Sequence, residues 1–192
     1  MLNRFQLYQL VLFIGLIGGN FLAILLPHPW NLTPTGAIAI FAGMYLYNRW
    51  LSLLAPLLGL LAANLFQGFS PIWYVYISFM LITCLGAILR NSSMRFEKQF
   101  LLGIPICFLS AMLFFLVTNF FCWLGSTTYP QTLEGLGDCY IMAIPFFWNT
   151  LYGDLFYFCV LMGLMAPFYP VWKSQSQLST AIAYNKTVQT EA

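Results

Sequence analysis

Six apolar segments, separated by short polar stretches, constrain this chain more than any other feature of its sequence. They cover about residues 5–26, 36–47, 51–66, 72–89, 100–124 and 144–166. A helix that crosses a bilayer needs about 20 predominantly apolar residues, a length that the first segment reaches and the second and third do not. The chain is 61% hydrophobic and 6% charged, whereas roughly 25% of the residues in a soluble domain are charged. The sequence therefore predicts an all-α integral membrane protein with six transmembrane helices.

The six segments leave no room for a separate soluble domain. We expect one membrane domain over residues 1–172 and a loose, polar cytoplasmic tail over residues 173–192. A cleaved signal peptide is the alternative interpretation of the first segment. It is disfavoured because no small-residue cleavage site follows, and residues 27–30 are Pro-His-Pro-Trp.

The distribution of basic residues predicts the orientation of the chain. With the N-terminus in the cytoplasm, all seven Lys and Arg residues fall on the cytoplasmic side: Arg4, Arg49, Arg90, Arg95, Lys98, Lys173 and Lys186. This agrees with the positive-inside rule. We therefore expect a multi-pass protein of the bacterial cytoplasmic membrane with both termini inside and a basic-free outer face. The formal net charge of +2 is too small to indicate nucleic-acid binding.

Polar and aromatic residues gather in the stretch from residue 118 to residue 154. We expect it to contain a long outer loop, with Glu134 and Asp138, that forms one wall of a binding site. Asp154 lies within the sixth segment, where an ionisable group is costly and indicates function by default; the alternative is a hydrogen-bonded packing residue. The candidate ligand-binding residues are His28, Trp30, Asn31, Tyr74, Tyr129, Tyr140, Phe147, Asn149 and Asp154.

The remaining chemistry-bearing residues are few. His28 is the only histidine and a candidate metal ligand, although a lone loop histidine is more often plain surface. Five cysteines without a CxxC pair do not indicate a disulfide framework or a structural zinc site. Walker A, HExxH and GxSxG motifs are absent from the sequence, so we do not expect an enzyme. Four asparagines within the apolar segments, Asn20, Asn64, Asn119 and Asn149, are expected to form interhelical hydrogen bonds, and a role in the site is the alternative.

Small residues recur along the first segment at Gly15, Gly19 and Ala23. They lie on one face of a helix and allow another helix to approach closely. Packing within the bundle explains this stripe, and a docking face for a partner subunit is the alternative.

Three stretches resemble a known family: NLTPTGAIAIFAGMYL (residues 31–46), VTNFFCWL (117–124) and YPQTLEGLGDCYIMAIPFFWNTLYGDL (129–155). They are similar to the substrate-binding S components of energy-coupling-factor vitamin transporters. The resemblance implies a six-helix fold that holds a vitamin near the outer face. It also implies that an energy-coupling ATPase module is a candidate partner, for which the stripe of Gly15, Gly19 and Ala23 is the natural docking face.

Within this class the chain looks most like the small solitary vitamin B12 transporters. That likeness implies cobalamin or another corrinoid as the transported ligand, with the Cys84 thiolate on cobalt and His28 as a further ligand. Thiolate-mediated removal of a cobalt axial ligand would be incidental to transport. Cys84 lies about 13 residues past Pro71, roughly 20 Å along an unbroken helix, so Cys122 and Cys139 remain alternatives. The competing hypotheses are an S component for a different vitamin, with structural cysteines, and an assembly protein without a small ligand.

Overall fold

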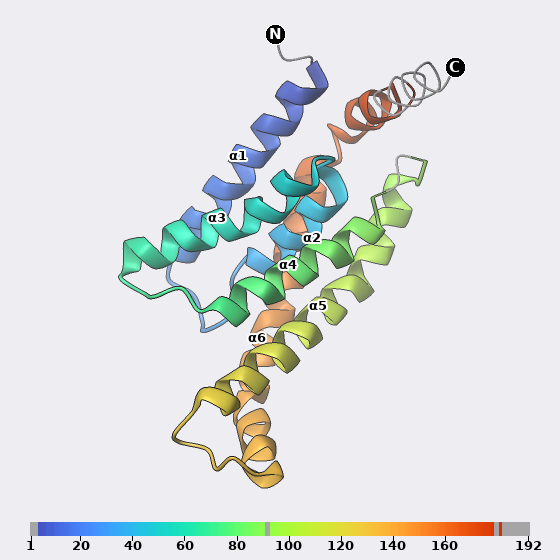
Figure 1. The fold of residues 1–192 in the computed structure, drawn as a ribbon. Helices are drawn as coiled ribbons and strands as arrows, with labels where there is room; N and C mark the ends of the chain where they lie inside the picture. Colours follow the sequence, from blue (N-terminus) through green and yellow to red (C-terminus); the bar gives the residue numbers. More distant parts are fainter. Residues whose placement is uncertain (1–3, 91–92, 179–180, 182–192) are drawn as a thin grey trace, which may run out of the picture.

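The structure is a computed structural model that describes residues 4–90, 93–178 and 181. These residues form α-helices and no strands, which confirms the all-α prediction for this part of the chain. The helices are α1 (Arg4–Leu25), α2 (Thr35–Tyr45), α3 (Arg49–Gln67), α4 (Trp73–Ile88), α5 (Phe96–Gly125) and α6 (Leu133–Met165), and a further helix follows at Tyr169–Leu178 (Figure 1).

Three helices of the described chain, α1, α3 and α5, are long and apolar enough to cross a membrane. A fourth candidate is α6 together with the helix Tyr169–Leu178, which is bent away from it by 76°. Pro167 lies at the bend, and a proline has no backbone N–H to continue the helical hydrogen bonds. Helices α2 and α4 are apolar but shorter, with 11 and 16 residues. The structure therefore has three or four apolar helices that are able to span a membrane.

Successive helices run back and forth between two ends of the bundle. Figure 1 shows the start of α1, the α2–α3 turn, the α4–α5 connection and the helix Tyr169–Leu178 at one end, which we call the basic end because Arg49, Arg90 and Lys173 lie there. The α1–α2, α3–α4 and α5–α6 connections lie at the opposite end. This alternation is the arrangement that the charge pattern predicted.

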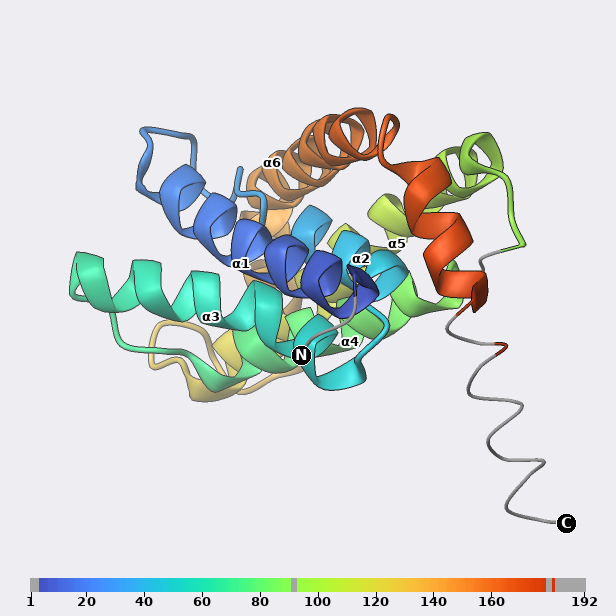
Figure 2. The ribbon, with the colours of Figure 1, turned by 90° about the horizontal axis from the view of Figure 1, so that it is seen from above.

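Helix α2 is the centre of the fold, and all of its residues are buried. Seen from above, it lies in the middle of the other helices (Figure 2). Its contact with α4 depends on two glycines: a Cβ at Gly43 would lie 2.3 Å from the Thr83 carbonyl oxygen, and a Cβ at Gly86 would lie 2.2 Å from the Ile40 carbonyl oxygen. The absence of side chains at these positions brings the two helix backbones into direct contact.

Both ends of α2 are capped by side chains from other elements. At its N-terminus Pro34 provides no side-chain cap, and the carboxyl group of Asp154 on α6 accepts the Ala37 N–H instead. At its C-terminus the Arg90 guanidinium donates to the Gly43 oxygen (2.7 Å) and the Tyr47 oxygen (3.2 Å). An acid at the N-terminus and a base at the C-terminus complement the helix dipole.

Two of the four asparagines join neighbouring helices, as expected from the sequence, whereas Asn119 donates to the Phe115 oxygen of its own helix and Asn149 to the Trp30 oxygen of the α1–α2 connection. The Asn20 amide of α1 donates to the Pro56 oxygen of α3 (2.9 Å) and accepts from the Thr35 hydroxyl of α2 (3.0 Å). The Asn64 amide of α3 donates to the Tyr76 hydroxyl of α4 (3.1 Å). These bonds satisfy polar groups that would otherwise be costly in an apolar environment.

The prediction of a long outer loop before the sixth segment is wrong. Helix α6 begins at Leu133, where the Thr132 hydroxyl accepts a hydrogen bond from the Gly135 N–H (3.2 Å), so Glu134 and Asp138 lie on a helix and the connection covers only residues 126–132. A threonine cap with an acid in the first turn is a helix-start signal. The nearby glycines obscured that signal, although Gly135 itself packs against the Pro130 carbonyl.

The C-terminal region also differs from the expected loose tail. The helix Tyr169–Leu178 crosses the expected boundary at residue 172, and Trp172 is fully buried, with its indole N–H donating to the Tyr45 oxygen (3.1 Å). A buried aromatic side chain thus ties the start of this segment to α2. Lys186 lies outside the described residues.

Candidate functional site

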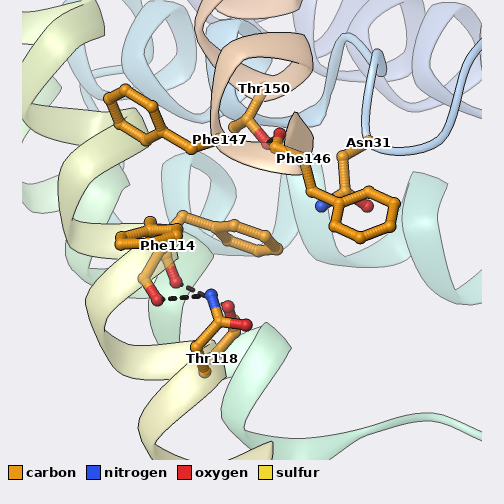
Figure 3. A pocket seen from close by; sticks show the side chains of 8 residues that line it. Asn31, Phe114, Thr118, Phe146, Phe147 and Thr150 are labelled. Carbon is orange, nitrogen blue, oxygen red and sulfur yellow. Dashed lines mark hydrogen bonds between the residues drawn. The ribbon is translucent and has the colours of Figure 1, made fainter. Parts of the chain in front are cut away.

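Two adjacent cavities lie between α5, α6 and the connection after α1. The first, the aromatic chamber, has a volume of about 210 Å³ and is lined by Asn31, Phe114, Phe115, Thr118, Asn119, Phe146, Phe147 and Thr150. Figure 3 shows how side chains of α5 and α6 border it together with Asn31. The second, the carboxylate chamber, has a volume of about 190 Å³ and is lined by Asn31, Thr33, Thr35, Gly36, Leu60, Val75, Phe79, Ile82, Phe114, Thr150 and Asp154. The chambers share Asn31, Phe114 and Thr150.

The connection after α1 reaches the chambers because α6 holds it in place. The Asn149 amide donates to the Trp30 oxygen (2.9 Å), and a Cβ at Gly153 would lie 3.2 Å from the Thr33 oxygen. Asn31 has a φ of 65°, a left-handed conformation that asparagine tolerates better than most residues. These contacts join two of the stretches that carry the family resemblance.

The polar side chains of the aromatic chamber present mainly hydrogen-bond acceptors. The hydroxyls of Thr118 and Thr150 donate to the Phe114 oxygen (2.7 Å) and the Phe146 oxygen (2.9 Å) within their own helices. The Asn119 amide donates likewise to the Phe115 oxygen (2.8 Å), and Figure 3 draws the bonds of the α5 residues. The hydroxyl protons are thus used, and the lone pairs of these groups, together with the second N–H of the Asn119 amide, remain for a ligand.

Asp154 is the one acidic residue lining either chamber in the described chain, and its exposed fraction is 1%. Its Oδ2 accepts the Ser110 hydroxyl (2.9 Å), and its carboxyl group also accepts the Ala37 N–H. A Cβ at Gly36 would lie 2.1 Å from Oδ1, so the glycine makes room for the carboxyl group. Asp154 therefore lines a cavity, as a binding residue would, and is also hydrogen-bonded within the bundle, as a packing residue would be.

The candidate ligand-binding residues divide into two groups. Asn31, Phe147 and Asp154 line the chambers, and Asn149 holds the connection that carries Asn31. The others lie outside the lining: Trp30 is 77% exposed, the Tyr74 ring stacks on Phe121, the Tyr140 hydroxyl donates to the Leu116 oxygen (2.7 Å), and Tyr129 is half-buried in the α5–α6 connection.

Sequence reasoning missed Phe114, Thr118 and Thr150 as lining residues. The pair Thr118–Asn119 interrupts an apolar run, and Thr150 directly follows Asn149. The sequence therefore offered a signal for Thr118 and Thr150, which are polar residues next to asparagines in apolar segments, and none for Phe114.

The two candidate metal ligands lie far from one another. His28 is at the opposite end from the basic end, with Nδ1 3.0 Å from the Pro29 oxygen and Nε2 3.1 Å from the Ile24 oxygen. Cys84 is an exposed free thiol near the basic end of α4, and it lines neither chamber. In the described part of the chain, no three His, Cys, Asp or Glu side chains are grouped so as to hold a metal ion.

These features define a class: an all-helical protein with apolar helices long enough to cross a membrane and an internal polar and aromatic site near one end. The chain belongs to DUF6580, a family of unknown function, which it matches over residues 4–177. No curated protein and no solved structure is similar to it.

Proposed function

We propose that the protein is a membrane uptake protein that binds a small vitamin or vitamin precursor in the two chambers. The observation that carries this proposal is the pair of adjacent chambers, in which polar acceptors lie among aromatic rings beside a buried carboxyl group. Small-molecule sites are typically apolar and aromatic cavities with a few convergent polar groups. The chambers combine both features.

The proposal places the chambers toward the outside of the bacterial cytoplasmic membrane. The basic residues gather at the end of the bundle opposite the chambers (Figure 1), and the positive-inside rule assigns such an end to the cytoplasm. In this arrangement α1 to α6 are six membrane crossings with both termini inside. The short α2 would cross within the protein, where all of its residues are buried, whereas the short α4 would present exposed apolar side chains such as Ile77 and Leu81 to lipid.

The volume of the chambers favours a compact ligand. Known small-molecule sites occupy about 300–1,000 Å³, and the two chambers, of about 210 and 190 Å³, lie together at the lower end of that range. A compound with one or two rings fits this space more readily than a corrinoid does.

The proposal is tested by identifying the compound that co-purifies with the protein. Thr150 borders both chambers, so the ring introduced by Thr150→Phe would take up space at their junction. The hydroxyl that the substitution removes bonds only within α6, to the Phe146 oxygen. We expect native mass spectrometry of the detergent-purified protein to detect a bound small molecule that Thr150→Phe removes. Tyr152→Phe, at an exposed position of the same helix, should retain it. A protein that carries no such compound, or carries it equally in all three forms, would favour an assembly role without a small ligand.

A corrinoid is the narrower form of the proposal and follows from the family resemblance; Cys84, the expected cobalt ligand, is a free and exposed thiol that lies outside both chambers. In this form of the proposal its thiolate ligates cobalt and incidentally displaces an axial ligand such as cyanide. The visible spectrum of the protein with cobalamin should then shift, and Cys84→Ser should restore the spectrum of the free compound. Unshifted spectra for both forms would leave a different vitamin as the ligand and the cysteines as structural residues.

We also propose that an energy-coupling ATPase module docks on α1 if transport depends on one. A Cβ at Gly15 or Gly19 would meet no atom within 4 Å, and Ala23 is half-buried, so the small-residue face is not used up by packing within the chain. The competing possibility is that the protein transports its ligand alone. Uptake by cells that lack such modules distinguishes the two.

A further inference from the structure

We propose that the site selects a ligand that carries a cationic nitrogen on or beside an aromatic ring, and that Asp154 pairs with this nitrogen inside the carboxylate chamber. The inference rests on the proposed function and adds the chemical class of the ligand. Three features of the described residues carry it: the charge balance at Asp154, the rings beside it and the surplus of acceptors around it.

The charge of Asp154 is only partly balanced by the protein. Its carboxyl group accepts the Ser110 hydroxyl and the Ala37 N–H, and the N-terminus of α2 contributes roughly half a positive charge. No Lys, Arg or His lines either chamber, and the ion pair of the described chain joins Arg95 and Glu97. A buried carboxyl group without a full partner charge takes up a proton unless a cation supplies that charge. A ligand cation in the adjoining cavity would provide it.

The aromatic side chains of the chamber favour the same kind of ligand. The rings of Phe79 and Phe114 both line the carboxylate chamber, with their centroids 5.1 Å apart. The faces of aromatic rings attract cations, and this attraction is strongest where water is excluded. A ring that carries a charged nitrogen would therefore contact the phenylalanines while its nitrogen reaches Asp154.

The polar groups around the carboxylate chamber provide acceptors beside Asp154. The hydroxyls of Thr35 and Thr150 donate to the Asn20 side chain and the Phe146 oxygen, so they offer lone pairs to a ligand rather than protons. Among the described lining side chains, donors for a ligand remain on the Asn31 amide, the Thr33 hydroxyl and the second N–H of the Asn119 amide. Acceptors beside a carboxyl group suit a ligand that carries N–H donors.

The test uses three probes of nearly equal size and different charge: benzylamine, benzyl alcohol and benzoate. Their dissociation constants for the full-length, detergent-purified protein are measured by calorimetry, for the wild type, Asp154→Asn and Asp138→Asn. Asp138→Asn is the matched control, because it removes an exposed acid from the same helix. We expect the wild type and Asp138→Asn to bind benzylamine at least about tenfold more tightly than benzyl alcohol, as a charge-assisted bond requires, and benzoate least well.

Asp154→Asn should bring the benzylamine to benzyl alcohol ratio close to one while benzyl alcohol still binds. Equal affinities in the wild type, or an unchanged ratio in Asp154→Asn, would overturn the inference and leave Asp154 as a cap for α2. The asparagine keeps an acceptor for Ser110 and Ala37, so the cap survives the substitution. If Asp154→Asn nevertheless fails to fold, the wild-type ranking of the probes decides, together with the loss of benzylamine binding in Thr150→Phe.

The two proposals fail in different ways. A co-purified compound that Thr150→Phe removes, combined with no preference for benzylamine, would overturn the cationic ligand and retain the uptake function. If no compound co-purifies with the protein and Thr150→Phe does not weaken the binding of any probe, both the uptake function and the cationic ligand are overturned.

Discussion

Two side chains from other elements, Asp154 and Arg90, make it possible for α2 to be buried along its whole length. The end groups of a short helix are a large share of its backbone, and unpaired groups are expensive away from water. Asp154 satisfies the Ala37 N–H, and Arg90 satisfies the oxygens of Gly43 and Tyr47. Burial lowers the pKa of the Arg90 guanidinium, and arginine remains charged at neutral pH. Arg90 can therefore act as a permanent cap.

Replacement of Arg90 by methionine should destabilise the protein. The substitution keeps most of the apolar side chain and leaves the two oxygens without their charged donor, which we expect to cost about 1–3 kcal/mol. Thermal unfolding of the detergent-purified protein, followed by tryptophan fluorescence, measures the change. Arg95→Met is the matched control, since the Arg95 side chain is 83% exposed and exposed ion pairs contribute about 0–1 kcal/mol. Equal melting temperatures for the two variants would contradict the capping role.

At the scale of elements, the contact between α2 and α4 depends on glycines rather than on interlocking side chains. Gly43 and Gly86 each face the backbone of the other helix, at distances that no Cβ could occupy. Small residues at helix interfaces allow close approach and are favoured in membrane proteins. This contact positions α4, which contributes Val75, Phe79 and Ile82 to the carboxylate chamber.

Gly43→Ala and Gly86→Ala should each separate α2 from α4. The added Cβ would lie 2.3 Å from the Thr83 oxygen or 2.2 Å from the Ile40 oxygen, and overpacking against backbone costs about 1–3 kcal/mol or more. Size-exclusion chromatography after heating in detergent measures the loss of folded protein. Gly163→Ala serves as the control, because nothing lies within 4 Å of its Cβ, and alanine is favoured over glycine in a helix by about 1 kcal/mol. If all three variants behave alike, the two helices do not depend on this close contact.

The start of α6 shows how local signals compete within one element. The combination of Thr132 and Glu134 favours a helix from Leu133 onward, and the structure begins α6 there. Gly135 and Gly137 have low helix propensity, yet α6 continues through both and through Pro145. Gly135 packs on the carbonyl of Pro130 in the preceding connection, so the absence of a side chain there lets that connection lie against the first turn of α6.

For the whole molecule, the main question is how many of the alternating helices cross the membrane. Three or four described helices reach the required length and composition, and α2 and α4 are shorter. The helix directions nevertheless alternate from α1 to α6 (Figure 1). The short α2 can still connect the two sides of a bilayer, because it is buried among the other helices and lipid does not contact it.

Reporter fusions test the proposed topology directly. We expect fusions after Asn48 and Ser93 to be active with a cytoplasmic reporter, and fusions after Ser70 and Thr128 to be active with a periplasmic reporter. The expectation follows from Arg49, Arg90 and Arg95 at one end and basic-free connections at the other. The same reporter signal at Asn48 and Ser70, or at Ser70 and Ser93, would show that α3 or α4 does not cross.

The sequence by itself determined the class of the protein, because the length and composition of apolar segments and the order of charges are local properties. It predicted an all-α fold and the alternation of basic and basic-free connections, and it identified Asp154 as an acid within an apolar segment. Only the tertiary structure decided that α2 is the central helix and that Asp154 caps it through Ala37. It also decided that Phe114 and Thr150 share two chambers with Asn31. These relations join residues far apart in the chain, and they depend on which faces of the helices pack together, which no local pattern specifies.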